Sequence, residues 1–369
     1  MSAATTKVAV VGSGMTGAIC ASKLARNGLS VTLFESARGP GGRMSQRRET
    51  CEDGTELLFD HGAPFFSVSN ADVLSLVHEW ELKGLVAEWK QNFGSFDCLS
   101  RKFLALEQEG LGKRYVGVPG MNSICRMLCS ETGVDSKYGV EVTKLEWLDD
   151  ENLWSLTGLA GQNIGLFKGV IATDKNIISA RFTDVTGCPP PLDSSMVPEL
   201  AVKLQDIPVN PCFVLMLAFA EPLSSIPVKG FSFKNSEILS WCYCNSSKPG
   251  RSTRSDLWVL HSTTKYARGI IAQTGLQKPS SEILTKVAEE LFQEFQSTGL
   301  NISQPFFRKA HRWGSAFPAA SIAGEEKCVW DKSKKLAICG DFCVSPSVEG
   351  SILSGLAAVS KLTGALLGM

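Results

Sequence analysis

A glycine-rich turn between two strand patterns constrains the fold of this 369-residue chain more than any other feature. Residues 7–11 form a short β-branched run, typical of a strand that is buried on both faces. The turn G-S-G-M-T-G follows at 12–17, and the small and apolar residues of 18–27 predict a helix. Residues 30–34 predict a second strand, closed by Glu35. This strand-helix-strand order predicts a parallel sheet.

The turn has the G-x-G-x-x-G spacing that binds the pyrophosphate of a dinucleotide. Gly12 permits the tight turn, Gly14 lets a pyrophosphate approach the backbone, and Gly17 lets the helix pack closely on the strand. The free amides at the start of the helix then bind the anion. Glu35, 18 residues after Gly17, is placed to accept a hydrogen bond from a ribose hydroxyl. NAD and FAD both use this fingerprint, so it does not choose between them.

A second glycine turn directly after Glu35 favours FAD. Residues 38–44 read R-G-P-G-G-R-M, with arginines at Arg38 and Arg43. FAD has two phosphates and a ribityl chain that crosses between domains. A second glycine-rich segment with an arginine serves that longer ligand. The alternative is a solvated basic loop.

The end of the chain repeats the strand, turn and helix pattern. Residues 336–339 predict a strand, Gly340-Asp341 a turn, and 350–367 a helix with apolar residues at near-helical spacing. The chain therefore returns to its first domain. Between the two ends, we expect an amphipathic helix over 280–295, capped by Ser280, and strands over 140–148, 154–159, 168–173, 213–220, 237–245 and 256–262.

Composition argues against several classes of function. Lys+Arg and Asp+Glu number 37 each, so the net charge is zero and a general nucleic-acid binder is not expected. No apolar run reaches the roughly 18 residues of a membrane span, and no signal peptide is recognised. The 12 cysteines are expected to be reduced thiols, and neither they nor the four histidines have metal-site spacing. We expect a cytoplasmic protein, or a plastid one if a transit peptide was removed before Met1.

Motifs along nearly the whole chain resemble a known family. Those at 12–17, Glu35 and 41–43 resemble the glutathione-reductase-type FAD proteins of the amine-oxidase branch. Other segments are similar to the renalase family, most closely its plant renalase-like members. These segments are F-D-H-G-A-P-F-F at 59–66, Y-V-G-V-P-G-M at 115–121, S-K-P-G-R at 247–251, H-R-W at 311–313, G-D at 340–341 and V-E-G-S at 348–351.

The resemblance implies the rest of a site for FAD, bound non-covalently. Asp341 would bond the ribityl or pyrophosphate region, with a simple helix cap as the alternative. The backbone of 348–351 would face the flavin O2/N1 edge, Val142 would hold adenine through its backbone, and 62–65 would line the isoalloxazine. The complete set of residues that we expect to bind the cofactor is Gly12, Gly14, Met15, Thr16, Gly17, Glu35, Ser36, Arg38, Gly42, Arg43, Gly62, Ala63, Pro64, Phe65, Val142, Gly340, Asp341, Glu349, Gly350 and Ser351.

We therefore predict an α/β fold with two domains. The first is a discontinuous, Rossmann-like FAD-binding domain of the glutathione-reductase and amine-oxidase type, over 1–72, 108–190 and 305–369. The second is an α+β substrate domain with an antiparallel sheet, over 73–107 and 191–304, and the run of prolines at 189–191 marks the crossing. The active site is expected between the domains.

His61, Phe65 and Trp313 are candidates to line the flavin, and none of them is a certain catalytic residue. Neither His61 nor His311 has an acidic partner at motif spacing, which favours a structural or orienting role. Trp313 would form a wall of the pocket or belong to the core. Hydride transfer from a dihydropyridine to flavin N5 needs no base, and the cofactor carries the electrons.

The renalase resemblance implies an FAD-dependent oxidase of isomeric dihydronicotinamide dinucleotides, with O2 as electron acceptor. Two alternatives stay open. The first is an oxidase of a small amine or another plant metabolite, held between aromatic walls. The second is a protein that holds FAD for structure or for docking a partner.

Overall fold

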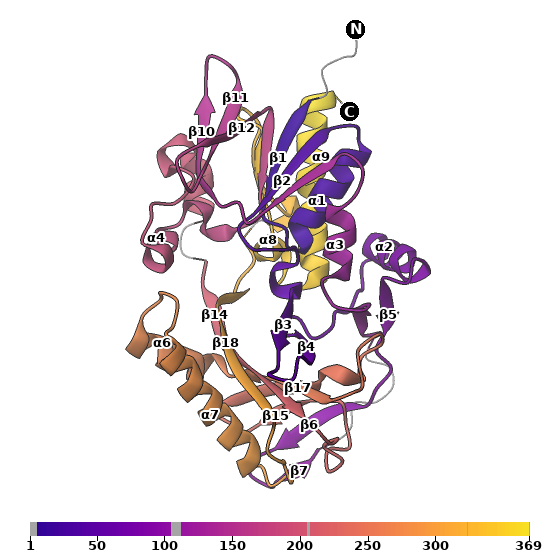
Figure 1. The fold of residues 1–369 in the computed structure, drawn as a ribbon. Coiled ribbons are helices and arrows are strands. Elements are labelled where there is room, and N and C mark those ends of the chain that lie inside the picture. The colour runs from indigo at the N-terminus through magenta and orange to yellow at the C-terminus, as the bar shows by residue number, and fades with distance from the viewer. Residues whose placement is uncertain (1–5, 105–111, 205–206, 323, 369) are drawn as a thin grey trace.

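The computed structural model describes residues 6–104, 112–204, 207–322 and 324–368, which form two domains stacked along the long axis of the molecule (Figure 1). The first domain is built on a six-stranded sheet that is parallel except for its β19–β20 edge. Its strands, in order across the sheet, are β19 (Val329–Asp331), β20 (Leu336–Ile338), β13 (Gly169–Ala172), β1 (Lys7–Val11), β2 (Ser30–Glu35) and β9 (Val134–Tyr138).

Three helices cover one face of this sheet, and α1 packs against both of the others (Figure 1). They are α1 (Met15–Arg26), α3 (Ser123–Cys129) and α9 (Val348–Leu367). A Cβ on Gly355 of α9 would lie 3.1 Å from the carbonyl oxygen of Thr16, so this glycine permits the close approach of α9 to α1. Although α9 is long and apolar enough to cross a membrane, half of its most apolar window is buried, as in a core helix.

The opposite face of the first sheet packs against a small sheet and short helices. A buried cluster around Trp154 and Leu200 joins them to β13 and β20. The small sheet comprises β10 (Val142–Leu148), β11 (Leu153–Gly158) and β12 (Asn163–Phe167), and the helices on this side are η2 (Lys175–Ile178), α4 (Ala180–Thr186), η3 (Ser194–Met196) and α5 (Pro198–Leu204).

The second domain is a seven-stranded sheet with α6 (Thr264–Thr274) and α7 (Ser281–Ser297) on its outer face (Figure 1). Side chains alternate along β14: Phe213 and Leu215 pack under α6 and α7, whereas Cys212 and Val214 belong to the core shared with the first domain. The strands, in order, are β18 (Phe307–Pro318), β14 (Val209–Phe219), β17 (Asp256–Ser262), β16 (Leu239–Cys244), β15 (Gly230–Lys234), β6 (Phe93–Asp97) and β7 (Lys102–Phe103).

Short elements connect the two domains. The hairpin of β3 and β4 leads from the second glycine turn toward the seven-stranded sheet (Figure 1). The remaining elements are η1 (Gly42–Met44), β3 (Gln46–Thr50), β4 (Glu56–Asp60), α2 (Ala71–Leu82), β5 (Val86–Glu88), β8 (Tyr115–Gly117), η4 (Asn245–Ser247), η5 (Gly324–Glu326) and α8 (Asp341–Val344).

Most expected elements are present, with shifted ends. The first helix begins at Met15 instead of residue 18, because Gly14 already serves as its N-cap. The last helix begins at Val348 instead of residue 350, and Ser280 does cap α7 by accepting a hydrogen bond from the Ile283 amide. The third strand of the small sheet, β12, was not expected. The second sheet is not wholly antiparallel either, since β6 joins β15 in parallel.

The predicted domain boundaries are wrong at three places. Strand β18 pairs with β14, so 307–318 belongs to the second sheet. Residues 191–204 stay in the core of the first domain, and the chain crosses at about β14 instead of at the prolines. Helix α2 also stays there, because it packs against α9 of the first domain. The predicted boundary between 107 and 108 lies outside the described residues.

Candidate active site

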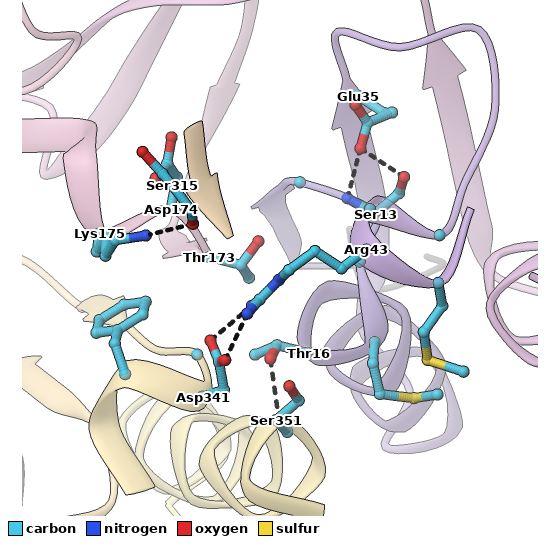
Figure 2. Close-up of a pocket in the computed structure, with 18 of the residues that line it drawn as sticks. Ser13, Thr16, Glu35, Arg43, Thr173, Asp174, Lys175, Ser315, Asp341 and Ser351 are labelled. Atoms are coloured by element: carbon cyan, nitrogen blue, oxygen red, sulfur yellow. Dashed lines mark hydrogen bonds and ion pairs between the residues drawn. The ribbon is translucent and has the colours of Figure 1, made fainter. Parts of the chain in front are cut away.

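A cavity of about 820 Å³ lies at the carboxyl ends of the parallel strands, where ligands bind in folds of this kind. Both glycine turns line it, and so do the ends of β2 and β13, the final residues of β18, and the start of α9. Figure 2 shows side chains from these segments converging on one space.

The first glycine turn needs each of its glycines for a different steric reason. Gly12 has a φ of +99°, and a Cβ there would lie 2.2 Å from Thr173 Oγ1. A Cβ on Gly17 would lie 1.9 Å from the carbonyl oxygen of Gly12, so Gly17 is required for packing and does not line the cavity. A Cβ on Gly14 would contact nothing within 4 Å, which leaves its backbone open to a ligand.

The first turn of α1 is suited to an anion. Its N-cap, Gly14, has no side chain to cap the helix, and the first turn carries no acidic residue. Gly14, Met15 and Thr16 all line the cavity. Helix amides without an intrahelical partner bind phosphate groups well, and the helix dipole adds to that attraction.

Glu35 lies at one end of the cavity and is held by the turn. Its Oε2 accepts hydrogen bonds from Ser13 N at 2.9 Å and Ser13 Oγ at 2.6 Å (Figure 2). Its Oε1 accepts one from Ala37 N at 2.8 Å. A carboxylate oxygen has two lone pairs, so a ribose hydroxyl can share these oxygens with the backbone.

Arg43 and Asp341 form a bidentate ion pair inside the cavity (Figure 2). The two N–O distances are both 2.7 Å, and the Asp341 side chain is only 4% exposed. Gly62 supports this arrangement from behind, because a Cβ there would lie 2.0 Å from the Arg43 carbonyl oxygen. In this ion pair, Arg43 can also bind an anion, and Asp341 can also accept a hydrogen bond from a hydroxyl.

The N-terminus of α9 forms another part of the lining. Ser347 caps the helix by accepting a hydrogen bond from Gly350 N at 2.9 Å, and Thr16 Oγ1 donates to the Ser351 carbonyl oxygen at 3.1 Å (Figure 2). Glu349 points elsewhere. Its carboxylate accepts from the amides of Ser69 and Asn70 at 2.7 and 2.6 Å, next to the start of α2.

Trp313, His61 and His311 form a compact aromatic wall. Their ring centroids are 4.8 to 5.0 Å apart, and Trp313 Nε1 donates to the His61 carbonyl oxygen at 3.0 Å. Burial, together with the nearby His311 ring, lowers the pKa of His61 to about 3, and burial lowers that of His311 to about 4. Both imidazoles are therefore neutral at pH 7. Trp313 lines the cavity, whereas His61 lies behind it.

A buried ion network lies behind His61. Asp60 Oδ2 contacts Lys248 Nζ at 3.1 Å and Arg251 Nη2 at 2.5 Å, with all three side chains at most 3% exposed. Burial by itself would raise the pKa of Asp60, but the two cations outweigh it and hold that pKa below its usual value. Tyr243 donates from its hydroxyl to the Asp60 carbonyl oxygen. This network ties the end of β4, just before His61, to the segment that follows η4. It carries two positive charges and one negative charge.

The structure brings most of the predicted site residues to the cavity. Those that line it are Gly12, Gly14, Met15, Thr16, Glu35, Ser36, Gly42, Arg43, Ala63, Pro64, Phe65, Val142, Trp313, Gly340, Asp341 and Ser351. Those that do not are His61, Gly17, Arg38, Gly62, Glu349 and Gly350. Arg38 is exposed, which agrees with the alternative of a solvated loop. Among the described residues, no group of three or more metal-ligating side chains comes together.

Sequence reasoning missed part of the lining. The missed residues include Thr173, Lys175, Phe182, Ser315, Phe317 and Ser347. Thr173 could have been found, because it ends an expected parallel strand and such ends meet at the ligand site. Lys175 could not, because its partner, the Ser315 carbonyl oxygen at 3.3 Å, lies on β18, 140 positions away (Figure 2). Burial lowers the pKa of Lys175.

Comparisons with known proteins agree with this architecture. A family model described as an NAD(P)-binding Rossmann-like domain matches residues 10–80. The mitochondrial protoporphyrinogen oxidase of Nicotiana tabacum is 38% identical over 77 residues, which cover 21% of this chain and 14% of that protein. This stretch is thus a small part of the relative's length.

Two solved structures match almost the whole chain. One, from Exiguobacterium sp. 255-15 and assigned as a protoporphyrinogen oxidase, has a TM-score of 0.69 at 13% identity and covers 99% of this chain and 100% of its own. The other, a putrescine oxidase triple mutant with redesigned cofactor binding, has a TM-score of 0.65 at 12% identity and covers 97% and 99%. Residues 10–80 thus match a Rossmann-like domain model, and the chain as a whole has the same fold as these two solved structures.

Proposed function

We propose that this chain is an FAD-dependent oxidoreductase, with the cofactor bound non-covalently in the 820 Å³ cavity. The observation that carries the proposal is the uncapped start of α1, open to the same cavity as Glu35 and the Arg43–Asp341 pair. These groups suit a pyrophosphate, a ribose and a ribityl chain in one elongated ligand. The Rossmann-like domain and the fold shared with the named oxidases support it.

The residues of the chain would bind and orient this cofactor. The amides of 14–16 and the Arg43 guanidinium hold the pyrophosphate, and Glu35 accepts from the ribose. The start of α9 also lines the cavity, and its helix dipole would stabilise negative charge on the reduced cofactor. Bound FAD would supply the two-electron acceptor and the means of passing those electrons to O2.

The proposed donor is a dihydronicotinamide dinucleotide whose hydride lies away from the usual ring position, as in the renalase family. Two features of the structure support this donor. Phe65 and Trp313 provide flat walls on which a flat ring can stack. The buried network of Asp60, Lys248 and Arg251 has an excess of positive charge behind His61, which disfavours a protonated amine.

A small amine is the second candidate donor. The putrescine oxidase neighbour and the aromatic walls favour it. The neutral state of His61 and His311 would even allow a proton to be taken from an amine. The charge of the buried network is the observation against it.

Acid precipitation tests the cofactor. The purified protein is expected to be yellow and to release FAD into the supernatant. Flavin that stays in the pellet would contradict non-covalent binding, and NAD alone in the supernatant would contradict the proposal as a whole.

Anaerobic titration tests the donor. Isomeric dihydronicotinamides are expected to bleach the flavin absorbance, and small amines are not. Bleaching by amines alone would establish the second candidate. Bleaching by neither class would favour a protein that holds FAD for structure or docking.

A further inference from the structure

Two basic side chains lie where η2 and α4 of the first domain meet β18 of the second sheet. Lys175 Nζ donates to the Ser315 carbonyl oxygen at 3.3 Å (Figure 2). Arg181 donates from Nε to Ser315 Oγ at 3.2 Å and from Nη2 to the Gly314 carbonyl oxygen at 3.0 Å. Lys175 and Ser315 line the cavity, whereas Arg181 lies outside its lining. These contacts place two positive charges beside one serine, one of them directly at the cavity.

The chain itself compensates these charges only in part. Within the part of the chain that the structure describes, neither cation forms an ion pair with a carboxylate; both donate to neutral oxygens. The adjacent Asp174 accepts from the Asn176 amide at 2.9 Å instead, and Asp341 is paired with Arg43. Burial lowers the pKa of both basic side chains, and the nearby carboxylates do not offset this effect.

The hydrogen-bonding groups that remain open here are donors. An ammonium group has three N–H donors, and one donor of Lys175 has a partner among the residues described. Ser315 Oγ accepts from Arg181, which leaves the hydroxyl hydrogen of Ser315 able to donate. A ligand group at this place is therefore expected to supply acceptors. An anion with several oxygens supplies them and also balances the charge.

Strand β18 joins this place to the aromatic wall. Trp313, Ser315 and Phe317 are spaced two residues apart along the strand, and all three line the cavity. Residues two apart in a strand project to the same face and are separated by about 6.6 Å. The second sheet thus presents a flat ring and, one repeat further along the strand, a place for an anion. A heteroaromatic ring that carries a ribose 5′-phosphate has a comparable reach.

Resting on the proposed function, we propose that Lys175 and Ser315 bind a phosphate ester group of the electron donor. The ammonium group and the hydroxyl donate to phosphate oxygens. Arg181 is a positioning residue that fixes the Ser315 side chain and adds positive charge. The donor class is therefore a nucleotide with a phosphate on its ribose, in preference to an uncharged nucleoside or a cationic amine.

Equilibrium binding to the FAD-loaded protein tests this subsite without turnover. The probes are nicotinamide mononucleotide and nicotinamide riboside, measured by calorimetry, which share ring and ribose and differ only in the 5′-phosphate. Wild-type protein is expected to bind the mononucleotide about tenfold to hundredfold more tightly, the usual effect of charge-assisted hydrogen bonds. Inorganic phosphate is the third probe and is expected to bind more weakly than the mononucleotide.

Variants separate the direct contact from the positioning role. Lys175→Gln should bring the ratio of the two affinities toward one, with little change for the riboside and no loss of FAD. Arg181→Gln should lower the ratio by about two- to tenfold, and Arg181→Lys should restore part of it. Lys203→Gln is the matched control, because it removes the same charge from an exposed position on α5 outside the lining. It should leave the ratio unchanged.

Equal affinities for mononucleotide and riboside in the wild type would overturn the subsite. A ratio that is unchanged in both Lys175→Gln and Arg181→Gln would overturn it as well. Inorganic phosphate that binds as tightly as the mononucleotide would assign the place to a free anion instead of the donor. Loss of FAD from a folded Lys175→Gln variant would place this lysine in the cofactor site and overturn the inference too.

Thermal unfolding shows whether each variant is folded at the assay temperature, and Arg181→Gln keeps the subsite testable if Lys175→Gln does not fold. The proposed function is tested separately, by release of FAD and by bleaching of the wild-type flavin with a dihydronicotinamide. A yellow protein that is bleached in this way but does not distinguish mononucleotide from riboside would overturn only the phosphate subsite.

Discussion

The two walls of the cavity are built in different ways. The wall from the first domain consists mainly of backbone groups in glycine turns and helix starts, each set by residues close together in the sequence, and the Arg43–Asp341 pair joins two of these segments. The wall from the second sheet consists of side-chain rings whose contacts are long-range, such as Trp313 with His61, 252 positions apart. We infer that the first wall holds the cofactor and that the second selects the substrate.

The largest effect is expected where the first wall has no room. In Gly17→Val, the new Cβ would lie only 1.9 Å from the Gly12 carbonyl oxygen, which is a severe clash. We expect a loss of about 3 kcal/mol in the free energy of unfolding, together with loss of FAD. Gly269→Ala is the control, because nothing lies within 4 Å of a Cβ there. Helix α6 should become more stable by about 0.5–1 kcal/mol. Chemical denaturation of both variants checks this, and equal stabilities would contradict it.

The Arg43–Asp341 pair carries the next largest effect. Arg43→Ala removes a charge-assisted contact to phosphate and leaves Asp341 buried without its bidentate partner. The loss should be on the order of 1.5–3 kcal/mol, or about tenfold to hundredfold in FAD affinity. Arg38→Ala is the matched control and should change affinity by less than about twofold, because Arg38 is exposed. Dialysis followed by flavin absorbance measures retention. If both variants keep all of their FAD, Arg43 does not bind the phosphate.

How much could be predicted from the sequence differs between these walls. The first strand-turn-helix-strand unit follows from local patterns, and its glycine roles agree with the geometry at Gly12 and Gly17. The pairing of β18 with β14 brings residues nearly a hundred positions apart into register, and no local pattern encodes it. The same holds for the parallel β6–β15 pair and for the contact of Lys175 with β18.

The second wall should make stability depend on pH. The folded pKa values of His61, His261 and His311 lie at about 3 to 4, below the unfolded value of about 6.5. The unfolded chain therefore binds more protons below pH 6.5, so stability falls as the pH drops from about 6.5 toward 4. At pH 5 the loss should be on the order of 2 kcal/mol per histidine. Denaturation of wild type and His261→Gln at pH 7 and 5 should show a smaller pH effect in the variant. An identical pH effect would contradict the buried, neutral state of His261.

The smallest effect is expected at Glu349, which belongs to neither wall. Its carboxylate accepts from the amides of Ser69 and Asn70 and ties α9 to the start of α2. Glu349→Gln weakens these charge-assisted bonds and should cost about 0.5–1.5 kcal/mol of stability. FAD retention should be unchanged, because the side chain does not line the cavity. Thermal unfolding and flavin absorbance check the two statements, and loss of FAD from a stable variant would place Glu349 in the cofactor site.

Anaerobic stopped-flow reduction tests the central claim, that the second wall presents a neutral dihydronicotinamide to the bound cofactor. The donors are the isomeric dihydronicotinamides, ordinary NADPH and a set of small amines. One isomer is expected to reduce the flavin on the order of a hundredfold faster than NADPH, since a displacement of about 1 Å can cost that much. The rate is expected not to depend on a histidine pKa between pH 5 and 8, because His61 and His311 stay neutral in that range. Fast reduction by an amine, with a bell-shaped pH profile that disappears in His61→Ala, would contradict it.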